Sequence, residues 1–253
     1  MPTVVMTHGA FCAGWAFEAF RTPFEARGWT VITPDLPGHG ESRGVAGLSM
    51  SDYARSVVKL CDELPEPPVL LGHSMGGLVC QMAARRAKAR ALVLLAPSPP
   101  WGVTGSSIEE AITAFGVHLA DPFWTSAVPP DRHLMRHHSL DRTPKAMRDR
   151  VLARLVPESG RAVREVLNWW LDPFMTTSVG VGALPMPSLA IAGDRDVVHP
   201  VATVRQTAER IGADFRVMSG MSHWLIGEEG WEEVAAIALD WLESRVRSAT
   251  TAS

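Results

Sequence analysis

The sequence predicts an α/β fold, with a mostly parallel central sheet and helices on both of its faces. Two observations carry this prediction. Short uncharged runs of apolar residues, which are typical of strands buried on both faces, alternate along the chain with longer segments of helical periodicity. The alternation stops at residue 98 and resumes near residue 186, which indicates a single sheet with an insertion between two of its late strands.

The part of the chain before the insertion predicts four strands and three helices. The strands are short β-rich or apolar runs at residues 3–7, 30–33, 68–71 and 91–96. The helices cover residues 13–27, 51–64 and 76–84. Gly28 closes the first helix as a C-terminal cap, and Ser49 or Ser51 caps the second before the prolines from Pro65 onward break it.

The part after the insertion repeats the same rhythm. Strands are expected at residues 188–192 and 215–218, and helices at 201–211 and 231–246. The intervening residues 98–185, here named the cap segment, show helical character from 131 to 170 and no convincing strand, so we expect a helical cap over one end of the sheet. The expected division is therefore 1–97 and 186–247 as the two parts of the core, 98–185 as the cap, and 248–253 as a frayed tail.

Composition excludes several classes of protein. The chain has 253 residues, enough for one large domain, and a net charge of −3, which is too small to indicate binding to nucleic acid or a membrane surface. No apolar run approaches the roughly 18 residues that span a bilayer. Its first residues lack the pattern of a signal peptide, and its three scattered cysteines fit a reducing compartment, so we expect a cytoplasmic location.

The most informative motif is a G-x-S-x-G stretch that follows the apolar run at 68–71 and precedes the helix at 76–84: Gly72, His73, Ser74, Met75 and Gly76. This context places Ser74 on a tight strand-to-helix turn, where the small residues let neighbouring chain pass close by. The amide of Met75 opens the helix, where an oxyanion could be held. Ser74 is therefore a candidate nucleophile.

A serine nucleophile needs a base and a group that orients the base, and in G-x-S-x-G hydrolases these follow in the order acid, then histidine. Asp194 and Asp196 follow the strand at 188–192, and His223 follows the strand at 215–218. The carboxyl ends of parallel strands share one edge of the sheet, so these side chains can converge on Ser74. Spacing alone leaves both aspartates open as the acid.

Over nearly its whole length the chain resembles the α/β-hydrolase superfamily. The resemblance implies a Ser74–His223–Asp196 triad, since Asp196 matches the acid of the G-x-x-D-x-x-x-P pattern, and it leaves Asp194 to position the turn. His8-Gly9-Ala10-Phe11 resembles the oxyanion loop of the family, which implies that the amides of Ala10 and Met75 hold the oxyanion while His8 is structural. The loop at 34–42 matches the D-x-x-G-x-G-x-S pattern of the family.

Two stretches of the first forty residues are Gly9-Ala10-Phe11-Cys12-Ala13-Gly14-Trp15 and Glu25-Ala26-Arg27-Gly28-Trp29. In these stretches the chain also resembles the branch of plant methylesterases and hydroxynitrile lyases. The lyases of that branch carry Thr after the first His and Lys after the catalytic His, whereas this chain has Gly9 and Trp224 there. The resemblance therefore favours ester hydrolysis. Ser74 in turn excludes epoxide hydrolases and dehalogenases, whose nucleophile is a carboxylate.

The resulting hypothesis is a serine hydrolase that cleaves a small-molecule carboxylic ester, with a small to medium apolar acyl or aromatic group, through an acyl-enzyme and without metal or organic cofactor. An apolar cap over the catalytic edge predicts a hydrophobic pocket. Its candidate residues are Phe11, Trp101, Phe123, Trp124, Trp169, Phe174, Met175 and Trp224. Carbon–carbon bond, lactone or thioester hydrolysis and perhydrolysis use the same triad and stay open, as does a non-catalytic ligand-binding role.

Two further groups in the cap segment have simpler explanations. Its many arginines could hold a substrate carboxylate, but a solvated helix face is the favoured interpretation. His133, His137 and His138 could suggest a metal site, since residues i and i+4 share a helix face. No carboxylate or cysteine completes a known ligand spacing, so we expect no metal.

Overall fold

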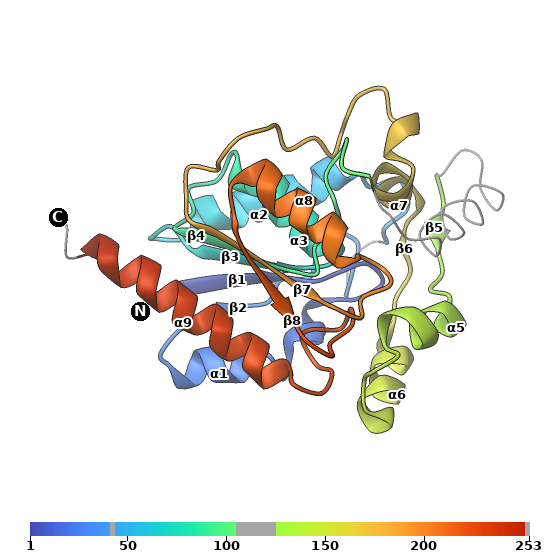
Figure 1. Cartoon of the computed structure of the whole chain (residues 1–253). Coiled ribbons are helices and arrows are strands. Elements are labelled where there is room, and N and C mark those ends of the chain that lie inside the picture. Colours follow the sequence, from blue (N-terminus) through green and yellow to red (C-terminus); the bar gives the residue numbers. More distant parts are fainter. Residues whose placement is uncertain (41–43, 105–124, 251–253) are drawn as a thin grey trace.

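The central sheet is parallel, as predicted. The structure is a computed structural model that describes residues 1–40, 44–104 and 125–250, without the side chains of 246–250 (Figure 1). In the described residues the main sheet has six strands in the order β2-β1-β3-β4-β7-β8, and every neighbouring pair is parallel. The strands are β1 (Thr3–Thr7), β2 (Thr30–Ile32), β3 (Val69–His73), β4 (Ala91–Leu95), β7 (Ser188–Gly193) and β8 (Asp214–Met218).

Helices cover both faces of this sheet (Figure 1). On one face lie α2 (Met50–Glu63), α3 (Met75–Ala84) and α8 (Val201–Ile211), and on the other lie α1 (Arg21–Ala26) and α9 (Trp231–Thr250). Side chains that alternate along a strand separate into two cores. Val4 and Met6 pack with the phenylalanines of the α1 region and with α9, whereas Val5 packs with α2, α3 and α8.

Two predicted helices differ from the observed ones. Residues 13–27 form the short 3₁₀ helix η1 (Gly14–Phe17) and then α1, instead of one helix. Pro23 explains the break, because proline fits only the first turn of a helix and α1 begins two residues before it. At the other end, α9 continues to Thr250 and includes three residues of the predicted frayed tail.

The cap segment lies between β4 and β7, which are neighbours in the sheet. The helices in its described residues are α5 (Arg132–Leu134), the π-helix η2 (Met135–Ser139), α6 (Lys145–Arg154), α7 (Gly160–Leu167) and the 3₁₀ helix η3 (Trp169–Leu171). It also contains an antiparallel pair that we did not predict, β5 (Ala127–Val128) with β6 (Glu158–Ser159). Strands of two residues are too short to show a periodic pattern in the sequence.

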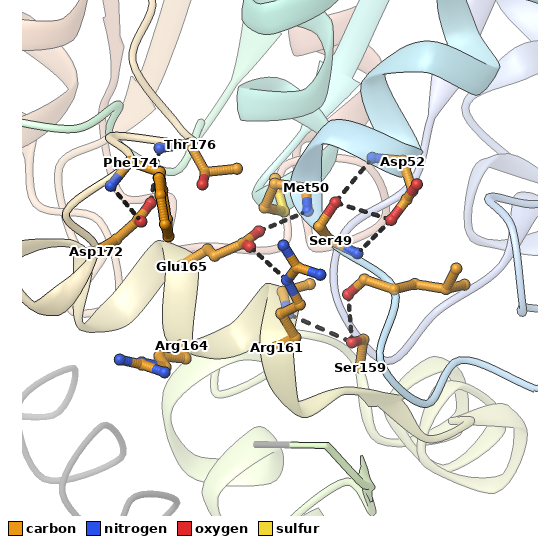
Figure 2. A network of polar contacts seen from close by, with 12 residues as sticks. Ser49, Met50, Asp52, Ser159, Arg161, Arg164, Glu165, Asp172, Phe174 and Thr176 are labelled. Atoms are coloured by element: carbon orange, nitrogen blue, oxygen red, sulfur yellow. Dashed lines mark hydrogen bonds and ion pairs between the residues drawn. The ribbon is translucent and has the colours of Figure 1, made fainter. Parts of the chain in front are cut away.

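Polar contacts attach α7 to the start of α2 (Figure 2). The carboxylate of Glu165 accepts hydrogen bonds from the Met50 amide at 2.8 Å and from Arg161 Nε at 2.9 Å. Ser159 Oγ donates to the carbonyl of Leu48 at 2.5 Å. The cap segment is thus held to the core by directional bonds.

Among the described residues, no helix is long and apolar enough to cross a membrane.

The N-cap of α2 provides a stability test, because the sequence left Ser49 and Ser51 as alternatives. The structure has a capping box in which Ser49 Oγ accepts from the Asp52 amide and Asp52 accepts from the Ser49 amide. Ser49→Ala should lower the free energy of unfolding by about 1 kcal/mol. Ser51→Ala, one residue inside the helix, should change it by less than about 0.5 kcal/mol in the same urea titrations. Equal losses would contradict the assignment of the cap.

Candidate active site

Ser74 occupies the turn between β3 and α3 with a left-handed backbone, φ 53° and ψ −125°. Such a conformation is costly for a residue with a side chain and persists only where neighbouring structure holds it. The Ser74 amide donates to the carbonyl of Leu95 on β4 at 3.0 Å. The Ser74 carbonyl accepts from the amides of Gly77 at 2.8 Å and Ser98 at 3.0 Å. Both backbone groups of Ser74 are therefore fixed.

The small residues on either side of Ser74 have a steric reason. A Cβ on Gly72 would lie 2.4 Å from the carbonyl oxygen of Gly76, and a Cβ on Gly76 would lie 2.2 Å from that of Thr7. Both distances are far below contact distance, so β1, β3 and the start of α3 pack backbone against backbone. Only glycine permits this approach.

His223 lies between Ser74 and Asp196 and is hydrogen-bonded to both. Its Nε2 is 3.0 Å from Ser74 Oγ, and its Nδ1 is 2.9 Å from Asp196 Oδ2. Asp196 follows β7 and His223 follows β8, so the ends of two strands bring them to the nucleophile turn after β3. Both side chains are nearly inaccessible to solvent.

The two aspartates after β7 differ in their contacts. Asp196 Oδ1 accepts from the amides of Val198 and His199, each at 2.8 Å, in addition to the His223 bond. Burial opposes the ionisation of Asp196, but attraction to His223 and these hydrogen bonds prevail and lower its pKa. Asp194 instead accepts from the Gly220 amide at 2.7 Å, in the turn that leads to His223.

Two further histidines surround His223. His73 Nε2 donates to the carbonyl of His223 at 2.8 Å, and burial with the nearby His223 lowers the pKa of His73 to about 3, so it is neutral. The His199 ring lies edge-on to His223, with centroids 5.1 Å apart, and its Nε2 is 2.9 Å from Ser98 Oγ. Sequence reasoning missed the Ser98–His199 pair, because the two residues are 101 positions apart in the chain and match no motif.

The loop after β1 lies opposite the start of α3. His8 Nδ1 donates to the Gly9 carbonyl at 2.9 Å, and His8 Nε2 accepts from the Leu36 amide at 3.0 Å, which defines one neutral tautomer. Burial and repulsion by His39 lower the pKa of His8 to about 4, in agreement with this assignment. Ala10 and Met75 both border the cavity above Ser74.

A cavity of about 150 Å³ opens beside Ser74. Its walls come from the β1 loop, the nucleophile turn, the loops after β7 and β8, and three cap elements, α5, η2 and α7. Two predicted pocket residues, Phe11 and Trp224, line it. Described residues of the cap segment in the lining are aliphatic or small polar ones and one histidine: Ser98, Leu134, Met135, His138, Ser139, Val163, Val166 and Leu167.

Four predicted pocket residues do not line this cavity: Trp101, Trp169, Phe174 and Met175. The rings of Trp101 and Trp169 pack edge-on against each other at 5.3 Å. Phe174 is 86% exposed, and Met175 is also exposed, because both lie on the loop after η3. Phe123 and Trp124 lie outside the described residues. In the part of the cap segment that the structure describes, α7 lines the cavity with Val163, Val166 and Leu167 in place of these four residues.

The charged and histidine-rich groups of the cap segment make local contacts. Arg154 pairs with Glu18, Arg161 with Glu165 and Arg136 with Asp149. The rings of His133 and His137 pack against each other at a tilt of 51°, with centroids 4.5 Å apart. Within the ranges that the structure describes, no group of three or more His, Cys, Asp or Glu side chains could hold a metal ion.

Comparisons with known proteins identify the family. Residues 4–237 match the model of the alpha/beta hydrolase family. A pimeloyl-[acyl-carrier protein] methyl ester esterase of Klebsiella pneumoniae is 30% identical over 208 residues, which are 76% of this chain and 77% of that protein. A magnesium-chelatase 30 kDa subunit of Rhodobacter capsulatus is 29% identical and covers 96% of this chain and 87% of its own length.

A solved structure agrees in fold. The esterase of Thermogutta terrifontis, determined with malate bound, superposes with a TM-score of 0.75 at 24% identity, covering 96% of this chain and 90% of that one. The match to the family model spans both sides of the cap segment and includes the nucleophile turn and the loops that carry Asp196 and His223. The chain therefore belongs to the alpha/beta hydrolase family.

Proposed function

We propose that this protein is a serine hydrolase that cleaves carboxylic esters with a small to medium apolar acyl or aromatic group through an acyl-enzyme. The observation that carries the proposal is the unbroken set of hydrogen bonds from Ser74 through His223 to Asp196, beside a cavity. An esterase among the relatives supports ester chemistry.

In this mechanism His223 Nε2 accepts the proton of Ser74 Oγ while the oxygen attacks the ester carbonyl carbon. The tetrahedral intermediate collapses, and the imidazolium gives its proton to the departing alcohol. Water then repeats the two steps on the acyl-enzyme and releases the acid. Asp196, which is ionised and hydrogen-bonded to Nδ1, orients the ring and stabilises its charged form.

The amides of Ala10 and Met75 are the proposed donors to the oxyanion. Met75 is the first residue of α3, so its amide has no partner within the helix and the helix dipole favours negative charge there. Ala10 borders the same cavity from the loop after β1. Donors held by rigid backbone stabilise the transition state without reorganising during the reaction, which is why such pairs dominate acyl-transfer catalysis.

The cavity indicates the class of substrate. Among the described residues of its cap wall, Leu134, Met135 and the side chains from α7 are apolar, and a volume of about 150 Å³ suits a short acyl chain or one aromatic ring. Lactone, thioester or carbon–carbon bond hydrolysis and perhydrolysis use the same residues, so a panel of these substrates separates them. A binding role without catalysis is the other alternative, and one relative carries the name of a magnesium-chelatase subunit. Such a role would not depend on the Ser74 hydroxyl.

The first test is the acyl-enzyme itself. A series of p-nitrophenyl esters from acetate to long acyl chains should give a burst of one p-nitrophenol per active site, followed by slower turnover. Ser74→Ala should remove the burst and lower kcat by about 10⁴- to 10⁶-fold, because no other oxygen occupies the position of the nucleophile.

Ser244→Ala on the exposed side of α9 is the matched control and should retain full activity. Circular dichroism of both variants establishes that they are folded. Turnover that survives in a folded Ser74→Ala protein would contradict the proposed mechanism. A wild-type protein with no turnover on any ester, lactone, thioester, carbon–carbon bond or perhydrolysis substrate of the panel would support a binding role.

The assignment of the acid is tested by the two neighbouring aspartates. Asp196→Asn should lower kcat by about 10⁴-fold, because an amide stabilises neither the required His223 tautomer nor the imidazolium. Asp194→Asn should lower kcat by less than about tenfold, because the carboxylate of Asp194 accepts from the Gly220 amide and the Ser219 hydroxyl and has no bond to His223. Steady-state kinetics on the best ester of the series checks both, and similar losses in the two variants would overturn the choice of Asp196.

A further inference from the structure

Glu158 is a fully buried carboxylate that no step of the proposed mechanism uses. It lies in β6 of the cap segment, and its exposed fraction is 0%. Burying a carboxylate costs several kcal/mol unless hydrogen bonds and an opposite charge compensate. The contacts of Glu158 therefore indicate what this residue holds in place.

Four donors from separate segments surround this carboxylate. Oε1 accepts from the Tyr53 hydroxyl of α2 at 2.6 Å and from the Ser159 amide at 2.8 Å. Oε2 is 3.0 Å from His39 Nε2 and accepts from the Phe11 amide at 3.4 Å. A single side chain thus connects the cap segment to α2, to the loop after β2 and to the loop after β1.

The charges at this position support one another. Burial disfavours the ionised form of Glu158, but the bonds from His39 and Tyr53 prevail, so the pKa of Glu158 is lowered and that of His39 is raised. Both ring nitrogens of His39 face acceptors, Glu158 Oε2 and the Pro37 carbonyl at 3.3 Å, so the doubly protonated ring forms a buried ion pair with Glu158. The His39 ring also lies edge-on to His8, with centroids 4.9 Å apart, and its positive charge helps to keep His8 neutral.

Phe11 is the residue through which Glu158 acts on the oxyanion loop. It directly follows Ala10, and its φ of 62° is unusual for an aromatic residue. The Phe11 amide donates to Glu158, and the Phe11 carbonyl accepts from the Val156 amide at 2.9 Å. Glu158 and Val156 of the cap segment therefore hold both backbone groups of this strained residue.

The peptide on the other side of Ala10 is held through His8. The Gly9 carbonyl, which belongs to the same peptide group as the Ala10 amide, accepts from His8 Nδ1. Because the C=O and N–H of a trans peptide point in opposite directions, this bond sets the direction of the Ala10 N–H. The Leu36 amide donates to His8 Nε2, so the neutral ring carries its proton on Nδ1, and protonation of Nε2 would break the bond from Leu36.

We propose that Glu158 is a positioning residue that couples the cap segment to the oxyanion loop: it holds Phe11 directly and the Gly9–Ala10 peptide through His39 and His8. The inference rests on the proposed function, because it assigns Glu158 to the alignment of the Ala10 amide. Glu158 touches no reacting atom, so it acts only through this backbone.

Glu165 provides a matched control. It is also a buried carboxylate of the cap segment and accepts from a core amide, that of Met50 (Figure 2). The hydrogen bonds of its carboxylate go to Met50 and Arg161 and do not involve the oxyanion loop. Glu158→Gln keeps the size of the side chain and an acceptor toward Tyr53 and Ser159. Its NH₂ group cannot accept from Phe11 and His39.

The expected result is a fall of about ten- to a hundredfold in kcat for Glu158→Gln with KM changed by less than about threefold, since a displaced donor affects the transition state more than bound substrate. Glu165→Gln should lose thermal stability to a similar extent but less than about twofold in kcat. Equal effects on kcat in the two variants would overturn the proposal.

A second readout is independent of activity. Amide exchange followed by NMR should show a protected Phe11 N–H in the wild type, and exchange about tenfold faster in Glu158→Gln but not in Glu165→Gln. If the wild type shows no Ser74-dependent turnover while Phe11 exchange responds as expected, the proposed function fails and the link from Glu158 to the loop stands. An unchanged Phe11 exchange rate in Glu158→Gln would refute the link itself.

If Glu158→Gln does not fold, Tyr53→Phe is the milder variant. It removes one of the four donors and leaves the ion pair with His39 intact. Because the Glu158 carboxylate is then held less firmly, kcat should fall severalfold at unchanged KM. The exchange rate of the Phe11 amide should lie between those of the wild type and Glu158→Gln. A Tyr53→Phe protein with wild-type kcat and wild-type Phe11 exchange would count against the proposal.

Discussion

The left-handed backbone of Ser74 is the constraint on which the candidate site depends. It is held by β4 through Leu95 and by the Ser98 amide, and it requires the close approach of β1, β3 and α3 that Gly72 and Gly76 allow. The nucleophile is therefore positioned by backbone contacts within the sheet. Because the position of Ser74 is fixed, His223 and Asp196 can reach it from the ends of two different strands.

Burial then determines which groups near that point carry charge. His8 and His73 are deeply buried and neutral, with pKa values lowered to about 4 and 3; His8 uses both ring nitrogens, and His73 uses Nε2, in hydrogen bonds to the backbone. Asp196 and Glu158 stay ionised because a histidine and several donors compensate their burial. His223 differs from His8 and His73 because it is hydrogen-bonded to both a hydroxyl, that of Ser74, and a carboxylate, that of Asp196.

The sequence predicted the parallel sheet and the order of its elements, because apolar strands and the G-x-S-x-G turn are local patterns. It also predicted that Ser74, Asp196 and His223 lie at one edge of the sheet, because the carboxyl ends of parallel strands share an edge. It could not predict that Trp101 and Trp169 pack together away from the cavity, or that Phe174 lies exposed. Those positions depend on contacts within an irregular segment, and neither composition nor periodicity encodes them.

The same reason explains why Glu158 escaped notice in the sequence, where it is one acidic residue among many arginines. Its meaning comes from partners at positions 11, 39 and 53, far away in the chain. Apolar contacts alone would allow the cap segment to shift over the core, because the hydrophobic effect is non-directional. Buried carboxylates at Glu158 and Glu165 add directional bonds to core amides, so the wall of the cavity and the backbone beneath it are aligned together.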